Sequence, residues 1–323
     1  MEKQTFYAHG KLLLTAEYFI LDGAVGLALP TKLGQSLSIE LLENHFNGTE
    51  NTEGGWKSFD ADGSLWFEAT LGLNDYDIKE TNDAATAERL TDILRAARAL
   101  KNSNTPYIPM HITTELTFPR AWGLGTSSTL IYNLATLFNI NPFDLLNKTF
   151  GGSGYDLACA GATKPILYNR INDIPHWQEV DFRPPFSEQL YFIYLGKKQN
   201  SREGIARYRE KMKGNTPSRN NRDFVPQQYF DEITALTNTF LGENDFKNFE
   251  KLIIEHEEKV ADVIQLKRVK SLIFNDFWGE IKSLGAWGGD FILATSDRTE
   301  AKTRTYFEAK GFNTFLTYRE LIL

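Results

Sequence analysis

A glycine- and hydroxyl-rich stretch, residues 119–128, stands directly before a helical hydrophobic repeat. It contains Gly123, Gly125 and three consecutive hydroxyl side chains, and it contains no acid. Such a turn directs backbone N–H groups outward at the positive end of the helix dipole, so it predicts an anion site, with phosphate as the usual guest. Hydroxyls there can bind Mg²⁺ or cap the helix, and an ordinary Ser/Thr cap stays open as the alternative. The apolar repeat falls on one helix face at Leu130, Ile131, Leu134, Leu137 and Phe138.

Length and charge narrow the class of protein. The 323 residues suffice for one large domain or two ordinary ones, and 41% hydrophobic with 24% charged residues is typical of a soluble globular chain. The net charge is −7 and no Lys/Arg run is present, so we expect no nucleic-acid partner. The most apolar segment, residues 12–29, carries Glu17 and Asp22 and is too broken to span a bilayer, so we expect no membrane partner.

The cysteine and histidine content excludes common metal and redox frameworks. Cys159 stands alone, so an internal disulfide or a cysteine-based metal cluster is excluded. The five histidines are scattered, with no ligand-like spacing. The chain begins with an acid where a secretion signal would have a basic region, and cytoplasmic localisation is expected.

The order of predicted elements indicates an α+β fold rather than a regular βαβ alternation. Strands come first, then mixed helices and strands, then a long helical stretch and a last pair of strands. We predict strands within 5–41 (including 15–21 and 35–40), a hairpin at 56–71, and strands at 108–116, 190–195 and 291–295. We predict helices at 83–100, after 128, at 142–146, after 154 and within 227–282.

Four segments, in order, carry a resemblance to a known family. Neither a Walker P-loop nor a Rossmann glycine fingerprint is present. Instead the chain resembles the GHMP small-molecule kinases, which include galactokinase, homoserine kinase, mevalonate kinase and phosphomevalonate kinase. The matching segments are Gly10-Lys11 with Ala16-Glu17-Tyr18 and Gly23; Pro119 to Ser127; Ser153-Gly-Tyr-Asp156-Leu-Ala158; and Lys282-Ser-Leu-Gly285-Ala-Trp287-Gly288-Gly289-Asp290.

The resemblance implies a two-lobed α+β fold. It combines an N-terminal lobe similar to domain 2 of ribosomal protein S5, at residues 1–180, with a ferredoxin-like C-terminal lobe at 181–323. The mevalonate and phosphomevalonate kinase branch fits best, because Glu17-Tyr18, the Ser-x-x-Asp-Leu-Ala segment and the Gly-Gly-Asp ending look like phosphomevalonate kinase. ATP and Mg²⁺ are the implied cofactors and a small molecule is the implied partner, while a homodimer stays possible.

Several positions depart from the family pattern, and Gly161-Ala162 in place of the family's Gly-Gly is one of them. Ala16 replaces the usual glycine before Glu17, and Thr126 replaces the first serine of the second motif. Trp287 stands where the third motif has a glycine, which puts a bulky ring where backbone should approach the substrate. The departure at Trp287 predicts a reshaped acceptor pocket or a distinct substrate.

The family match assigns the second motif to ATP. Backbone N–H groups of Gly123, Leu124, Gly125, Thr126, Ser127 and Ser128 would hold the phosphates, and the Ser127 hydroxyl would bind Mg²⁺. Asp156 matches the residue that accepts the proton of the attacking hydroxyl in mevalonate kinase. A phosphate acceptor is already anionic, and Asp156 would then only orient Lys11; capping of the following helix is the other interpretation.

Two further groups of residues are assigned to catalysis and to the acceptor. Lys11 precedes an apolar run, where a lysine is costly unless paired; we predict pairing with Asp156 and the transferred phosphate, and snorkelling to water is the alternative. Glu17 is either near the acceptor or, as we favour, in a buried salt bridge. Substrate contacts are also predicted for Ser153, Ser201, Gly288 and Gly289.

The leading hypothesis is an ATP-dependent kinase that acts on 5-phosphomevalonate or mevalonate in isoprenoid precursor synthesis. A GHMP-type kinase for another small alcohol or sugar is the second hypothesis. The third is a non-catalytic nucleotide-binding sensor on the same scaffold. The joint presence of Lys11, Ser127 and Asp156 argues against the sensor.

Overall fold

The described part of the chain packs as two units, each assembled from separate stretches of sequence. The computed structural model describes residues 3–41, 53–72, 75–101, 110–196, 201–213, 227–285, 287 and 290–323. Unit 1 comprises Met1–Gly10, Leu33–Arg120 and Leu124–Gly161, and unit 2 comprises Lys11–Lys32, Ala121–Gly123 and Ala162–Leu323. These units are sets of residues that pack together; the lobes at 1–180 and 181–323 stay a prediction.

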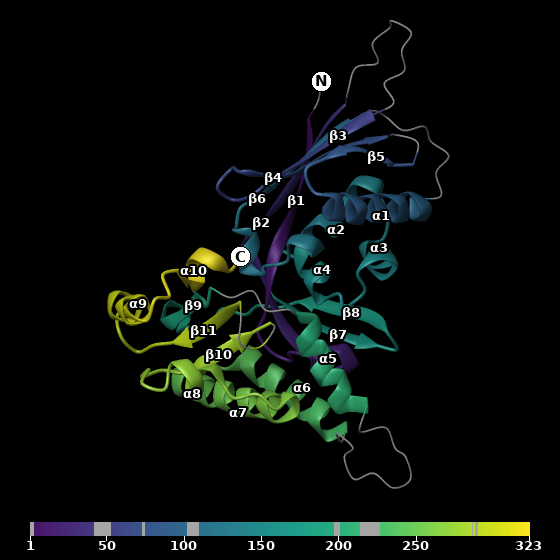
Figure 1. Cartoon of the computed structure of the whole chain (residues 1–323). Coiled ribbons are helices and arrows are strands. Elements are labelled where there is room, and N and C mark those ends of the chain that lie inside the picture. The colour runs from purple at the N-terminus through teal and green to yellow at the C-terminus, as the bar shows by residue number, and fades with distance from the viewer. Residues whose placement is uncertain are drawn as a thin grey trace, which may run out of the picture. The chain divides into compact units, whose positions relative to one another are not determined.

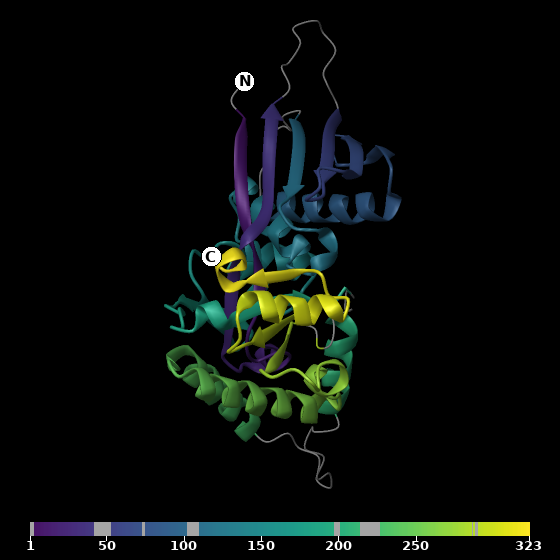
Figure 2. The ribbon, with the colours of Figure 1, turned by 90° about the vertical axis from the view of Figure 1, so that its left-hand side faces the viewer.

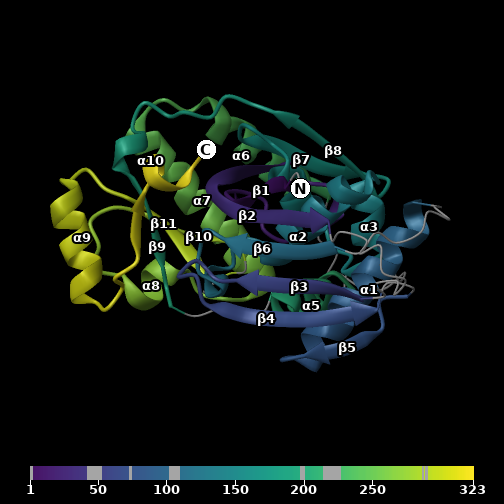
Figure 3. The same ribbon diagram turned by 90° about the horizontal axis from the view of Figure 1, so that it is seen from above.

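Unit 1 is built on a mixed sheet. Its strands run in the order β5-β4-β3-β6-β2, side by side in Figure 3, with β3 parallel to β6 and the other neighbours antiparallel. The β3–β4 hairpin turns at Gly63, which has a φ of 80°, as the sequence predicts. The strands are β1 (Gln4–Leu13) and β2 (Gly26–Leu41), which both continue into unit 2, β3 (Glu53–Phe59), β4 (Leu65–Gly72), β5 (Ile78–Thr81) and β6 (Met110–Leu116).

Helices cover the apolar side of this sheet. They are α1 (Ala84–Lys101), α2 (Thr126–Phe138), α3 (Pro142–Thr149) and α4 (Tyr155–Ala160), and Figure 1 shows α1, α2 and α3 close together. A single hydrophobic core joins Trp56 and Phe67 of the strands to Leu90 of α1 and Leu134 of α2. The predicted apolar helix face after residue 128 is thereby confirmed for Ile131 and Leu134, which are fully buried.

Unit 2 contains a four-stranded antiparallel sheet of ferredoxin-like topology. The strands are β9 (Leu190–Tyr194), β10 (Ile281–Leu284), β11 (Phe291–Thr295) and β12 (Phe315–Thr317), and their order is β10-β11-β9-β12. Helices follow β9 and one helix follows β11, which gives the βαββαβ sequence of that fold. The α+β class and the ferredoxin-like element that the resemblance implies are confirmed.

Some helices of unit 2 pack on this sheet, and the others pack against those helices. The helical elements are the 3₁₀ turn η1 (Phe19–Asp22), α5 (Ser201–Lys213), α6 (Gln227–Gly242), α7 (Phe246–Ile264), α8 (Val269–Ile273), α9 (Glu300–Ala309) and α10 (Tyr318–Leu321). Figure 1 shows α7 and α8 beside β10, and Figure 2 shows α9, in yellow, along the last strand. The start of β2 pairs with the β7–β8 hairpin (Ile166–Ile171 and Ile174–Glu179).

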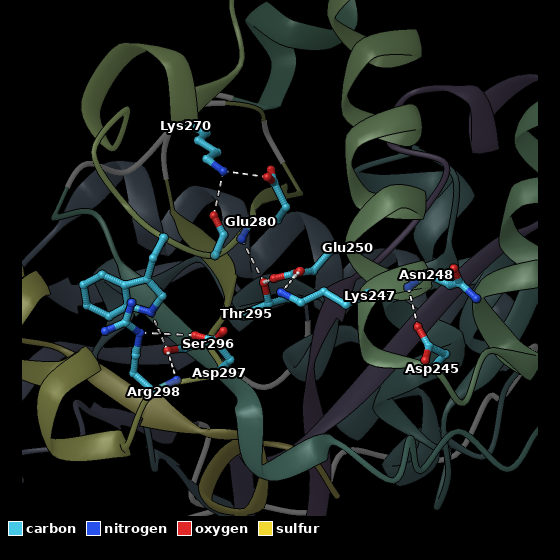
Figure 4. Close-up of polar contacts among 12 residues, drawn as sticks. Asp245, Lys247, Asn248, Glu250, Lys270, Glu280, Thr295, Ser296, Asp297 and Arg298 are labelled. Atoms are coloured by element: carbon cyan, nitrogen blue, oxygen red, sulfur yellow. Dashed lines mark hydrogen bonds and ion pairs between the residues drawn. The ribbon is translucent and has the colours of Figure 1, made fainter.

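Polar side chains connect α7 to the strands. Thr295 of β11 accepts a hydrogen bond from the Glu280 N–H at 2.8 Å and donates one to the Glu250 carboxylate at 2.7 Å (Figure 4). Lys247 lies 2.8 Å from Glu250, and Lys270 lies 2.5 Å from Glu280. Because these carboxylates are largely buried and each has a cationic partner, the helices are held on the sheet in a defined register.

Two predicted elements are wrong. Residues 15–21 form no strand: Ala16 and Tyr18 have left-handed backbone conformations, and a 3₁₀ turn follows. The helical pattern at 227–282 ends earlier, because residues 281–284 form β10. All four residues of β10 are buried, and its apolar residues Ile281 and Leu284 are three positions apart, a spacing that also fits one face of a helix. In the described part of the chain, no helix combines the length and apolar character needed to cross a bilayer.

Candidate functional site

The glycine turn before α2 has the geometry of an anion site. Gly123 and Gly125 have φ values of 70° and 105°, which side chains rarely tolerate. A Cβ at Gly123 would lie 2.3 Å from Oδ2 of Asp290, so only glycine fits there. Gly125 is the N-cap of α2 and no side chain caps this helix. The first N–H groups of a helix have no partner inside it, and no side chain caps them here.

The hydroxyl groups of this turn divide into buried and exposed ones. Ser128 is buried and donates to the Gly125 carbonyl at 2.8 Å, and the buried Thr129 hydroxyl donates to Oε1 of Gln35 at 2.9 Å. Ser127 is exposed. The hydroxyls therefore do not form the ordinary helix cap that the sequence left open, and Ser127 is the most exposed of them.

Lys11 reaches the same glycine turn within unit 2. It lies near the end of β1 and its Nζ donates a hydrogen bond to the Gly123 carbonyl at 3.0 Å. The ammonium group is thereby directed to the turn by a backbone contact rather than left to snorkel to water. Its pairing with Asp156 joins residues of different units and stays a prediction.

Asp156 lies at the start of a helix, as predicted. Gly154, with a φ of 84°, precedes α4, and Asp156 occupies the first turn of that helix, half-buried. Its Oδ1 accepts a hydrogen bond from the Leu157 N–H at 3.0 Å. This contact is local and fixes the direction of the carboxylate, so the capping interpretation and a catalytic role are compatible.

Glu17 lies in a fully buried polar cluster within unit 2, which we call the Glu17 cluster: Glu17, His256, Glu257, Lys282 and Ser283. Lys282 Nζ lies 2.5 Å from Glu17 Oε1 and 3.8 Å from Glu257 Oε1, and these three side chains are 0% exposed. The Ser283 N–H donates to Glu257 at 3.0 Å. The buried salt bridge favoured for Glu17 is confirmed, and its role toward a substrate stays a prediction.

The backbone around Glu17 is strained. Ala16 and Tyr18 both have positive φ, 67° and 66°, which costs about 1–2 kcal/mol for a residue with a side chain. The conformation is held because the Ala16 N–H donates to His256 Nε2 at 2.9 Å while Lys282 holds Glu17. A left-handed conformation at position 16 explains physically why the resembling family has glycine there.

Burial controls the protonation of the Glu17 cluster. Burial raises the pKa of Glu257 to about 8, with Lys282 opposing the shift. It raises the pKa of Glu17 too, again against Lys282. Burial holds the pKa of His256 well below 6.5, and the charge of Lys282 adds to this effect. At neutral pH the cluster therefore contains a protonated Glu257 and a neutral His256 beside the 2.5 Å contact between Lys282 and Glu17.

We expect the free energy of unfolding to fall by about 2 kcal/mol between pH 6.5 and pH 8 through Glu257. In this range the folded chain keeps a proton on Glu257 that the unfolded chain has released. The stabilisation that this bound proton gives the folded state is lost as the pH rises through 8. His256 acts with the opposite sign, and only below 6.5. Urea unfolding across this range should show the slope in wild type and not in Glu257→Gln.

Glu258→Gln is the matched control for this prediction, because Glu258 is the neighbouring residue on α7 and is 65% exposed. It should keep the wild-type slope. A Glu257→Gln variant whose stability still falls from pH 6.5 to 8 would contradict the protonation state assigned to Glu257.

The remaining predicted site residues are placed in part. Ser153 is half-buried in the turn before α4. Ser201 begins α5, and its side chain lies outside the described residues, as do Gly288 and Gly289. Trp287 is buried, and its backbone N–H donates to the Tyr18 hydroxyl at 3.2 Å. The described residues contain no cluster of His, Cys, Asp and Glu suited to a metal ion.

Sequence reasoning missed His256 and Glu257. Both lie on α7, where they are fully buried between Phe249, Ile253 and Val260. The signal was present, since a histidine and a glutamate occupy the apolar face of an amphipathic helix, where each must have a partner.

Comparison with known proteins establishes the fold. No known family model matches the chain, and no curated protein matches it. Solved structures match over nearly the whole length. Galactokinase from Lactococcus lactis, solved with galactose, has a TM-score of 0.69 at 14% identity and covers 98% of this chain and 93% of its own.

Two mevalonate-pathway enzymes give similar values. Mevalonate kinase from L. major, solved with R-mevalonate, has a TM-score of 0.65 at 13% identity, covering 97% of this chain and 94% of its own. Phosphomevalonate kinase from Streptococcus pneumoniae, solved with phosphomevalonate and AMPPNP, has a TM-score of 0.65 at 14% identity. The match covers 98% of this chain and 100% of the phosphomevalonate kinase. The structural neighbours are GHMP kinases, and the chain has the fold of these small-molecule kinases from end to end.

Proposed function

We propose that this chain is an ATP-dependent small-molecule kinase of the GHMP type. The observation that carries the proposal is the start of α2: an uncapped helix that opens after two left-handed glycines, with the Ser127 hydroxyl exposed, in a chain with the fold of known kinases. Phosphoryl transfer needs positioning and charge neutralisation more than covalent chemistry by the protein. A helix start of this kind supplies donors for phosphate oxygens.

The residues present fit ATP and Mg²⁺. The N–H groups of Gly125, Thr126 and Ser127 would bind phosphate oxygens, and Ser127 would supply a hydroxyl ligand to Mg²⁺. Mg²⁺ is usually held by one or two protein ligands together with substrate phosphates, so no dedicated cluster of carboxylates is needed. When bound, the metal neutralises charge that develops on the phosphoryl group.

Lys11 and Asp156 have the chemistry for the transfer step. The Lys11 ammonium, held at the Gly123 carbonyl, would stabilise charge on the transferred phosphoryl group. Asp156, oriented by the Leu157 N–H, would accept the proton of an attacking hydroxyl. For a phosphate acceptor no proton need be removed, and Asp156 would orient other groups instead.

The acceptor we propose is 5-phosphomevalonate or mevalonate. The Glu17-Tyr18 pair and the Ser153 to Ala158 segment support this branch, and so do the neighbours that bind these two compounds. The galactokinase neighbour supports a sugar as a second candidate. A coupled ADP-release assay with mevalonate, 5-phosphomevalonate and galactose tests all three. Binding of AMPPNP without turnover on any acceptor would select the nucleotide sensor instead.

We expect Ser127→Ala to raise the Mg²⁺ concentration needed for half-maximal ADP release about tenfold, because it removes a ligand of the metal. A Mg²⁺ titration at saturating ATP measures the effect. Ser128→Ala is the matched control, since the Ser128 hydroxyl is buried against Gly125, and it should leave the titration midpoint unchanged. Identical titrations for Ser127→Ala and wild type would contradict the metal role.

A further inference from the structure

The strained turn at residues 16–18 is held from several sides in unit 2. His256 accepts from the Ala16 N–H, and Lys282 holds Glu17. The Tyr18 ring stacks on Tyr208 of α5, with centroids 5.9 Å apart. Backbone strain of this kind persists only where the surrounding structure over-determines it, and it concentrates at ligand sites. The turn therefore presents Tyr18 in one fixed orientation.

Trp287 is fixed to that orientation. Its backbone N–H donates to the Tyr18 hydroxyl at 3.2 Å, and the residue is 4% exposed. Gly204 of α5 is the other neighbour of the hydroxyl, since a Cβ there would lie 2.3 Å from the Tyr18 oxygen. Tyr18 thus links α5 to the connection between β10 and β11.

The indole N–H of Trp287 has no hydrogen-bond partner among the described residues, although it is buried. Leaving a buried donor unpaired costs about 1–3 kcal/mol, and an unpaired group in a native structure calls for an explanation. A phenylalanine would fill a similar space without this cost. The donor is therefore accounted for if a ligand oxygen accepts a hydrogen bond from it.

The same connection also contacts the glycine turn. Asp290 follows Trp287 in the β10–β11 connection and lies directly against Gly123, whose carbonyl accepts from Lys11. Within unit 2, Trp287 therefore contacts Tyr18, and Asp290 contacts Gly123, the residue to which Lys11 donates.

We infer that Trp287 is a specificity-determining residue whose indole N–H donates a hydrogen bond to an oxygen of the phosphoryl acceptor. This inference rests on the proposed function, because it takes the second ligand of a kinase as the occupant.

The test is the kinetics of Trp287→Phe with the acceptor that wild type uses best among mevalonate, 5-phosphomevalonate and galactose. We expect the KM for that acceptor to rise about tenfold, while kcat and the KM for ATP stay within about twofold of wild type. This is the result of losing one hydrogen bond that is made equally in the substrate complex and in the transition state. Trp177→Phe is the matched control, since Trp177 is 48% exposed on β8. An unchanged acceptor KM in Trp287→Phe would overturn the inference.

Indole N–H resonances of ¹⁵N-labelled wild type give a second readout that does not need turnover. One of the six tryptophan signals should shift on addition of the acceptor and not on addition of AMPPNP. Trp287→Phe assigns that signal; if this variant does not fold, replacing the other five tryptophans one at a time assigns it by elimination. A shift confined to other tryptophans refutes the inference. Absence of ADP release with every acceptor refutes the proposed function itself.

Discussion

Replacing Asp156 with asparagine should lower kcat by about 10²–10⁴-fold if the acceptor is an alcohol, because the general base is lost. The amide oxygen can still accept from the Leu157 N–H, so α4 keeps its first turn. AMPPNP binding, measured by calorimetry, should stay within about twofold of wild type. With 5-phosphomevalonate the loss should be smaller, because the attacking oxygen is already anionic.

Asp144→Asn is the control for the Asp156 variant. Asp144 also occupies the first turn of a helix in unit 1, α3, and is exposed. It should keep the wild-type kcat with every acceptor. Wild-type turnover of mevalonate or galactose by Asp156→Asn would remove the base assignment, and loss of AMPPNP binding would assign Asp156 to the nucleotide instead.

Replacing Lys282 with methionine should lower the free energy of unfolding by about 3–5 kcal/mol. Lys282 and Glu17 are both 0% exposed, so the substitution leaves a carboxylate in an apolar interior without its counter-ion. Urea unfolding near neutral pH measures the change. The double variant Glu17→Met with Lys282→Met should recover most of the loss, since two side chains of similar volume then pack where the ions were.

Lys259→Met makes the same change in an ion pair that is partly exposed. Lys259 lies 2.5 Å from Glu232 on the surface of α6 and α7, and its loss should cost less than about 1 kcal/mol. Equal losses in the free energy of unfolding for Lys282→Met and Lys259→Met would show that burial does not make the Lys282–Glu17 pair more costly to break than a partly exposed pair. A double variant no more stable than Lys282→Met alone would exclude a direct Lys282–Glu17 coupling.

Much of the fold was predictable because local patterns and tertiary packing agree. The 56–71 hairpin, the helix at 83–100 and the apolar face after residue 128 all appear as predicted. The strand predicted at 15–21 does not, because Ala16 and Tyr18 take positive φ values that contacts with the distant His256, Lys282 and Trp287 help to sustain. Local propensity carries no information about such contacts.

The candidate site was predictable to the level of motifs. The glycine turn and the placement of Asp156 at a helix start follow from short-range chemistry. The partner of Lys11 in unit 2, the Gly123 carbonyl, is a backbone atom and leaves no trace in side-chain patterns. The role of Lys282 was hidden for another reason: its partner Glu17 is 265 residues away in the chain.

The interleaving of the two units has a consequence for biosynthesis. Lys11–Lys32 emerges from the ribosome before Ala162–Leu323 but packs with it. Residues 11–32 therefore lack their packing partners, and Glu17 lacks Lys282, until β10 has left the exit tunnel of the ribosome. Two polypeptides made by dividing the gene near codon 180 should accordingly be insoluble when each is expressed alone. When they are expressed together, they can associate and fold as a complex.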